Sequence, residues 1–186
     1  MTHNSDSQFK NQFLIALSNL EGDYFAQSIS LIVDHNEDGA FALMINRPID
    51  TDLAELFPDH RLSMDTQRFP VLEGGPVEQD CGFFIHRGPK TYEGSFEIFS
   101  DLYLTTATEL LDDLDNANGP DQVLTFLGYA GWGPGQLEEE LAENVWLLAP
   151  ADPAVLFETP FEDKACRAAA SIGVDLNLFG RSAGHG

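Results

Sequence analysis

The sequence predicts an α+β fold in a single domain, with mostly antiparallel strands and helices packed around them. The chain has 186 residues, a length that suits one hydrophobic core. Its first half contains short apolar runs separated by Gly, Pro, Asn or Asp, which is typical of antiparallel strands. The apolar spacing becomes helical after Thr106. We expect one domain over residues 1–186, with a polar leader (1–10) and a tail (180–186) as flexible ends.

The first strands are predicted by apolar and β-forming residues. Phe13–Leu17 predicts one strand. Ile29–Val33 and Phe41–Ile45 flank the polar turn His35–Gly39, and together they predict a hairpin, because Asp38-Gly39 supplies a residue with positive φ. Arg47-Pro48 ends this hairpin.

The middle of the chain predicts a short helix and several more strands. The helix is expected over Asp52–Leu56, and Phe69–Leu72 then leads into the breaker Gly74-Gly75-Pro76. Three further strands are expected over Cys81–His86, Phe96–Phe99 and Leu102–Thr105.

Helical spacing then appears. Thr106-x-x-Glu109 matches a capping box, and it predicts a helix that Asn118-Gly119-Pro120 ends. Val123–Leu127 predicts a buried strand that enters a glycine turn at Gly128. Beyond that turn, a helix carries an apolar stripe at positions 137, 141 and 145, a strand covers Trp146–Ala149, and a helix covers Glu162–Ile172.

The glycine-rich segment is the predicted functional surface. Glycines at 128, 131, 133 and 135 permit positive φ and close approach, with Tyr129 and Trp132 between them. A nucleotide site is disfavoured there, because Gln136 stands where the third glycine of a G-x-G-x-x-G motif belongs and Pro134 lacks an amide. The alternative is a close strand–helix packing turn in which Trp132 is buried or caps a cleft.

Charge limits the partners of this protein. Nine Lys and Arg against 31 Asp and Glu give a net charge of −22, and the cations are scattered. This field repels nucleic acid and anionic membranes, so we expect neither as a direct partner, and basic protein partners fit better. Acidity that serves solubility or a saline environment is the other interpretation. Cys81 and Cys166 lack metal-type spacing, which predicts reduced thiols in or near a core and a cytoplasmic protein.

The histidines leave alternatives open. His35, Glu37 and Asp38 form either a metal or acid/base cluster or, as we favour, a solvated hairpin tip. His86 either lines a pocket or, as we favour, is a hydrogen-bonded strand-edge residue. His185 lies near the predicted flexible end. We expect no metal and no cofactor, and no catalytic motif is recognisable.

Five motifs in order resemble the AlgH/YqgE family of bacterial proteins. They are His35-Asn-Glu-Asp-Gly-Ala40, Ile45-Asn-Arg-Pro48, Gly74-Gly-Pro-Val77, the run from Gly128 to Glu138, and Ala183-Gly-His185. Gly186 departs from the alanine expected there. The resemblance implies a barrel-like sheet flanked by helices, and no agreed catalytic residues. Some members are labelled transcriptional regulators connected with alginate production.

The leading hypothesis is a non-enzymatic binding or regulatory module that acts through protein partners. The rival is an enzyme or small-molecule-binding protein with a cleft at the glycine turn, where Arg47, His86 and Glu138 converge. The predicted binding surface comprises His35, Asn36, Asp38, Asn46, Arg47, Gly74, Gly75, Pro76, His86, Tyr129, Trp132, Gly133, Gln136 and Glu138.

Overall fold

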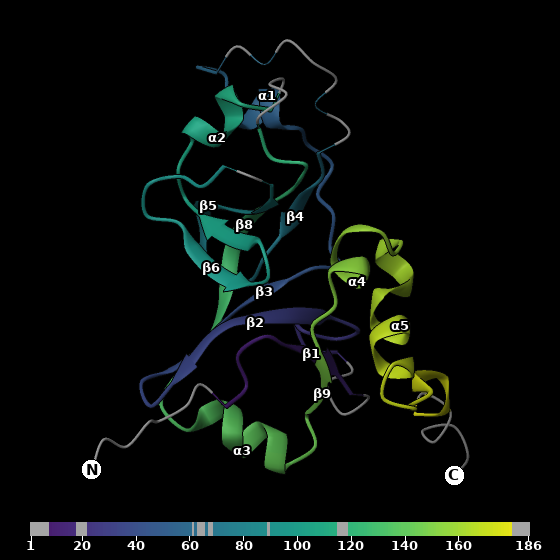
Figure 1. Cartoon of the computed structure of the whole chain (residues 1–186). Helices are drawn as coiled ribbons and strands as arrows, with labels where there is room; N and C mark the ends of the chain where they lie inside the picture. The colour runs from purple at the N-terminus through teal and green to yellow at the C-terminus, as the bar shows by residue number, and fades with distance from the viewer. Residues whose placement is uncertain are drawn as a thin grey trace. The chain divides into compact units, whose positions relative to one another are not determined.

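The structure is a computed structural model that describes residues 8–17, 22–60, 62, 66, 69–88, 90–114 and 119–179 (Figure 1). It divides into two compact units, Met1–Arg47 with Ala130–Gly186 (unit 1), and Pro48–Tyr129 (unit 2). Strand β8 (Gln122–Trp132) supplies residues to both. The predicted flexible tail, including His185, and positions 1–7 of the predicted leader lie outside the described residues.

Unit 1 is built on an antiparallel sheet in the order β9-β1-β2-β3-β8. Its strands are β1 (Gln12–Ala16), β2 (Ile29–Asn36), β3 (Gly39–Met44), the end of β8, and β9 (Trp146–Pro150). The predicted hairpin is confirmed as β2–β3. Its turn is shorter than predicted, because Asn36 pairs with Gly39 and leaves two residues between them.

Helices cover this sheet in unit 1. They are α3 (Gln136–Ala142), α4 (Pro153–Phe157), α5 (Lys164–Ala170) and the 3₁₀ turns η3 (Phe161–Asp163) and η4 (Leu176–Leu178). Helix α3 packs on the sheet through Leu137, which joins a core with Leu14, Ile32 and Ala42. In place of the single helix predicted over 162–172, the chain forms η3 and then α5. Helix α4 was not predicted.

A lysine is buried between α4 and α5. Lys164 is 1% exposed, and its Nζ donates to the backbone carbonyls of Val155 and Leu156 at 2.7 Å each. Burial lowers the pKa of this amine to about 8. The lysine therefore ties the end of α4 to the start of α5.

Unit 2 contains an antiparallel sheet in the order β6-β7-β5-β8, to which β4 adds a parallel pairing with β8. Its elements are α1 (Leu53–Leu56), β4 (Val71–Glu73), β5 (Val77–Arg87), β6 (Phe96–Phe99), β7 (Leu102–Thr105) and α2 (Glu109–Asp112). The core combines sheet residues such as Phe84 and Val123 with Leu53, Leu110 and Leu111 from the helices.

Two sequence predictions about local structure are wrong. Helix α2 begins at Glu109 rather than at Thr106, because the neighbouring Thr105 hydroxyl accepts a hydrogen bond from the Ala107 amide and no capping box forms. The segment from Gly128 to Trp132 continues strand β8 and is not a turn. The turn is confined to the residues between β8 and α3.

The α+β class with a mostly antiparallel, barrel-like sheet and flanking helices is confirmed. The domain boundaries of 1–186 stay a prediction. Both cysteines are exposed, contrary to the expectation that they lie in or near a core. In the described part of the chain, every helix is too short or too polar to cross a bilayer.

Candidate functional site

Trp132 lies inside unit 1 and not on its surface. Its side chain is 6% exposed, because the pairing of Ala40 with Trp132 places the ring among the residues that α3 covers. The prediction that this indole forms a contact surface is therefore wrong. The alternative of a buried packing residue is the one the structure supports.

One carboxylate holds both tryptophans of the chain. Glu140 Oε2 accepts from Trp132 Nε1 and from Trp146 Nε1, each at 2.8 Å. The two rings lie 5.9 Å apart at 78°, and Phe25 packs against both. Glu140 was not among the predicted site residues, although its position three residues after Leu137 places it beside the buried stripe of α3.

The true turn before α3 is exposed. It contains Gly133, Pro134 and Gly135, and Gly135 adopts φ +73° at the helix start. The Gly133 amide donates to Gln136 Oε1 at 3.1 Å, and Gln136 Nε2 donates to Glu140 at 3.1 Å. Gly133 and Gln136 are both exposed, and Gln136 is bound to the same carboxylate as the tryptophans.

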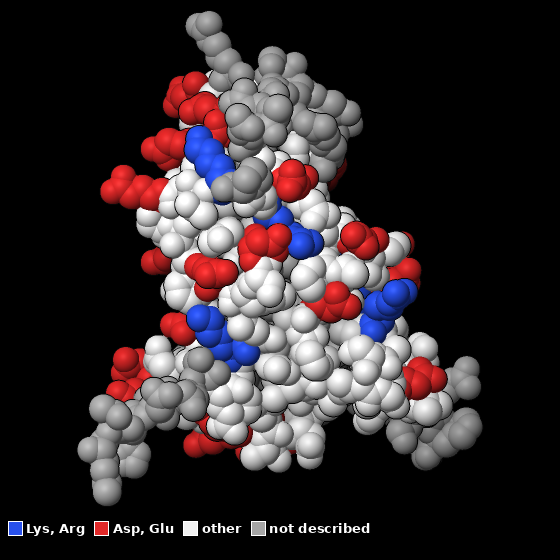
Figure 2. All heavy atoms as spheres, in the orientation of Figure 1, with Lys and Arg blue, Asp and Glu red and all other residues white. Residues whose placement is uncertain are grey.

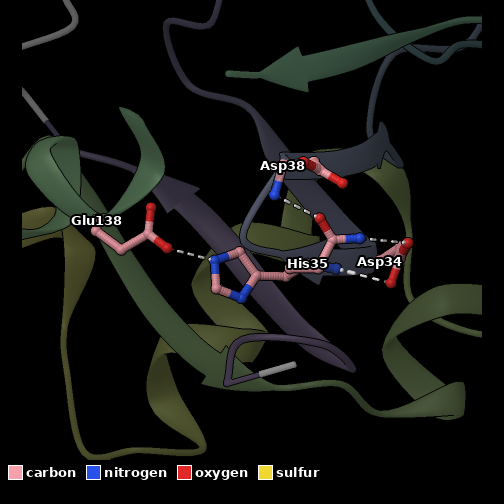
Figure 3. Close-up of polar contacts among 5 residues, drawn as sticks. Asp34, His35, Asp38 and Glu138 are labelled. Atoms are coloured by element: carbon pink, nitrogen blue, oxygen red, sulfur yellow. Dashed lines mark hydrogen bonds and ion pairs between the residues drawn. The ribbon is translucent and has the colours of Figure 1, made fainter. Parts of the chain in front are cut away.

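His35 and Glu138 form a pair between the hairpin and α3 (Figure 3). His35 Nε2 lies 2.6 Å from Glu138 Oε1. His35 is 5% exposed, and the Phe9 ring packs on it with centroids 4.8 Å apart. The prediction of a solvated tip is thus wrong for His35. A hydrogen bond from its own backbone amide, and then the bond to His35, lower the pKa of the Glu138 carboxyl.

The rest of the hairpin end is exposed and acidic. Asp34 Oδ1 accepts from the His35 amide at 3.0 Å, and Asn36 Oδ1 accepts from the Asp38 amide at 2.8 Å (Figure 3). Asp34, Asn36 and Asp38 are all exposed. Because the side chains fix the turn backbone, the carboxylates around it are held in place.

Asn46 and Arg47 have structural contacts in unit 1. The Asn46 side chain accepts from the Ile29 amide at 3.2 Å and donates to the Gln27 carbonyl at 2.9 Å. Arg47 donates to the carbonyls of Tyr24 and Ala26, and its guanidinium lies 5.1 Å from the Tyr24 ring centroid. These contacts hold the end of β3 against the segment before β2.

Three predicted residues of unit 2 serve packing. Gly74 and Gly75 are buried, and the Gly74 amide donates to the Leu127 carbonyl at 2.8 Å. A Cβ added at Gly128, where φ is +73°, would lie 2.5 Å from the Gly75 oxygen. The ring of Tyr129 packs edge-on against Phe83 with centroids 6.0 Å apart, whereas Pro76 is exposed. The glycines therefore permit close backbone approach.

His86 is fully buried in unit 2. Its ring stacks on Tyr103 with centroids 5.5 Å apart and meets Tyr92 edge-on at 5.3 Å. Neither ring nitrogen has a hydrogen-bond partner among the described residues. The favoured interpretation, a hydrogen-bonded edge residue, is therefore wrong. Burial lowers the pKa of His86. The flanking tyrosines were not predicted. The pairing of β5 with β7 brings Tyr103 to His86, whereas Tyr92 comes from the loop between β5 and β6.

We expect His86 to make unit 2 sensitive to acid. The folded pKa lies below the unfolded value of about 6.5, so the unfolded chain binds a proton first and stability falls as the pH drops below about 6.5. Urea unfolding at pH 7.5 and pH 5.5 should show a loss about 1 kcal/mol smaller in His86→Phe than in the wild type. Equal losses in both proteins would contradict this assignment, since the other titrating groups are shared.

Two residues of the rival hypothesis have partners within unit 1. Arg47 is held by backbone carbonyls and Glu138 by His35, whereas His86 belongs to unit 2. Within the described ranges, no three His, Cys, Asp or Glu residues are arranged to hold a metal ion.

Acidic side chains recur over the face shown in Figure 2, with a few Lys and Arg between them. The site that the geometry supports is the exposed acidic surface around the His35–Glu138 pair.

Comparison with known proteins agrees with this fold. A UPF0301 protein of Hahella chejuensis is 40% identical over 181 residues, covering 97% of this chain and 98% of the relative. The UPF0301 protein AlgH of Pseudomonas aeruginosa is 41% identical over 189 residues and the full length of both. The solution structure of AlgH from that organism aligns over the full length of both chains, with a TM-score of 0.78 and 40% sequence identity.

A more distant structure shares the fold. The crystal structure of a Corynebacterium diphtheriae protein gives a TM-score of 0.74 at 21% identity, over 96% of this chain and 94% of the other. The model of the AlgH-like family matches residues 13–177. With a family match over most of its length and relatives about 40% identical along it, the chain belongs to the AlgH-like family.

Proposed function

We propose that this protein is a non-enzymatic binding module that docks a basic protein partner on one acidic face of unit 1. We call this face the acidic hairpin surface. It consists of Asp34, Asn36, Glu37, Asp38, Gly133, Gln136, Glu138 and Glu139.

The observation that carries the proposal is the bond between His35 and Glu138. The two residues are 103 positions apart in the sequence, and their 2.6 Å contact fixes the hairpin end beside the start of α3. Carboxylates from two distant segments are thereby gathered, while Asp34 and Asn36 hold the turn backbone. A surface that is ordered before binding loses less conformational entropy when a partner docks.

Charge determines the kind of partner. The chain carries a net charge of −22, so its field attracts cations and speeds their association at low salt. Duplex DNA is repelled by the same field, so a regulatory action would use protein contacts rather than operator binding. The free cysteines Cys81 and Cys166 suit the reducing cytoplasm, where we place this activity.

Affinity capture from a cytosolic lysate tests the proposal with two triple variants. Glu37→Gln/Asp38→Asn/Glu139→Gln removes charge from the acidic hairpin surface. The control Glu158→Gln/Glu162→Gln/Asp163→Asn removes the same charge from exposed positions near α4 and α5. We expect partners retained by the wild type and by the control to be lost from the first variant. Equal retention by all three proteins, or equal loss from both variants, would remove the case for this surface.

A further inference from the structure

The second ring nitrogen of His35 is an unused acceptor buried beside the acidic hairpin surface. Nε2 is engaged by Glu138, whereas Nδ1 is buried and has no hydrogen-bond partner in the part of the chain that the structure describes. A buried polar atom without a partner costs about 1–3 kcal/mol, so such an atom next to an exposed site needs an explanation.

The contact with Glu138 fixes the chemistry of Nδ1. Glu138 is ionised when its pKa is lowered, and a carboxylate only accepts hydrogen bonds, so Nε2 carries the proton that it donates. In the neutral imidazole Nδ1 then presents a lone pair. The carboxylate also fixes the orientation of the ring, as second-sphere carboxylates do elsewhere. The group that completes this site must therefore be a hydrogen-bond donor.

Phe9 is the aromatic neighbour of the His35 ring. Its ring lies 4.8 Å from that of His35, tilted by 44°, and Phe9 itself is half-buried. It belongs to the turn before β1, which the Asn11 backbone fastens to Ile32 and Ala151. Phe9 also packs against the core that contains Leu14, Ile32 and Leu137, so a rotation that uncovers His35 would also expose part of that core.

The surrounding charge selects the donor. Glu138 is half-exposed beside His35, whereas the exposed Asp34 side chain lies on the opposite side of the strand (Figure 3). A neutral donor would add no positive charge beside the Glu138 carboxylate, whereas an ammonium group satisfies both the lone pair and this charge. Charge-assisted hydrogen bonds are also the stronger kind.

We infer that His35 anchors the proposed basic partner by accepting a hydrogen bond at Nδ1 from an inserted lysine ammonium group, which displaces the Phe9 ring. This inference rests on the proposed function, because it names the chemical group of the partner that the acidic hairpin surface recognises. It assigns Glu138 the role of holding the ring and Phe9 the role of a cover.

The direct test uses a blocked hexalysine peptide and the full chain labelled with ¹⁵N-histidine. Two-bond ¹H–¹⁵N spectra at pH 8 report whether each ring nitrogen accepts, donates or does neither. We expect the Nδ1 resonance of His35 to move as an accepting nitrogen does when hexalysine is added, with Nε2 unchanged. An Nδ1 resonance that stays fixed while the peptide binds would overturn the inference.

Variants separate this inference from the docking proposal. His35→Phe should bind hexalysine about tenfold more weakly, and Phe9→Ala about threefold more tightly, since no cover has to move. Near-UV circular dichroism checks that both variants are folded.

The outcomes distinguish the two proposals. If the Glu37/Asp38/Glu139 variant no longer binds hexalysine while His35→Phe binds like the wild type, the docking surface is supported and the role of His35 as an anchor is overturned. If neither variant loses affinity, both proposals fail. Unchanged or weaker binding by Phe9→Ala would overturn the cover.

Discussion

Glu140→Ala is expected to destabilise unit 1 by about 2–4 kcal/mol, because two buried indole N–H groups lose their shared acceptor. Trp132 and Trp146 are 6% and 4% exposed, and each donates to Glu140 Oε2 at 2.8 Å. Each buried donor left unsatisfied costs about 1–3 kcal/mol, and partial access of water to the emptied position keeps the sum below the upper limit.

Urea denaturation followed by tryptophan fluorescence measures this effect directly. The chain contains two tryptophans, and both lie at Glu140, so the signal comes from the region that the substitution changes. Glu139→Ala is the matched control, since Glu139 is exposed on the same helix and should change stability by less than about 0.5 kcal/mol. Glu140→Gln retains one oxygen acceptor and should fall between the two. A Glu140→Ala midpoint equal to that of Glu139→Ala would show that the carboxylate is not the acceptor that holds these rings.

Gly39→Ala should destabilise unit 1 by about 2–5 kcal/mol, from steric overlap together with backbone strain. A Cβ at this position would lie 2.0 Å from the Trp132 carbonyl oxygen, and Gly39 has φ +136°. The residue stands where the hairpin turn meets the pairing of β3 with β8. Either the turn or that pairing has to shift to make room.

Gly133→Ala provides the control in the facing segment. Nothing lies within 4 Å of a Cβ built on Gly133, and its φ is outside the left-handed region. Its unfolding free energy should stay within about 0.5 kcal/mol of the wild type. Thermal unfolding of the two variants side by side tests the prediction, which fails if their melting temperatures agree.

Local sequence patterns predicted which helices and strands form better than they predicted the residues at which these begin and end. The hairpin was predictable because Asp38-Gly39 has its own turn chemistry between two apolar runs. Gly128 was misread as the start of a turn, since a glycine that ends a strand and one that lets another backbone approach have the same sequence signal. The approach of Gly75 to Gly128 depends on strand pairing, which no local window contains.

The candidate site was predicted as a set of residues but not as an arrangement. His35 and Glu138 were both named, yet their bond crosses 103 positions and depends on how β3 pairs with β8. Trp132 was placed on the surface because its glycine neighbours suggested an open loop. The burial of His86 could not be predicted either, because a polar residue at the end of an apolar run gives no indication that two tyrosines will pack around it.

The buried Lys164 can be used to measure how often α4 and α5 separate. The chain has three lysines, at positions 10, 90 and 164. At pH 8 about half of the Lys164 amines lack a proton and are nucleophilic, yet only 1% of the residue is exposed to a reagent. Acylation of exposed Lys90 should be fast, whereas acylation of Lys164 has to wait until the two helices part. Mass spectrometry of the modified peptides would then give the rate of Lys164 acylation, and with it the rate at which the two helices separate.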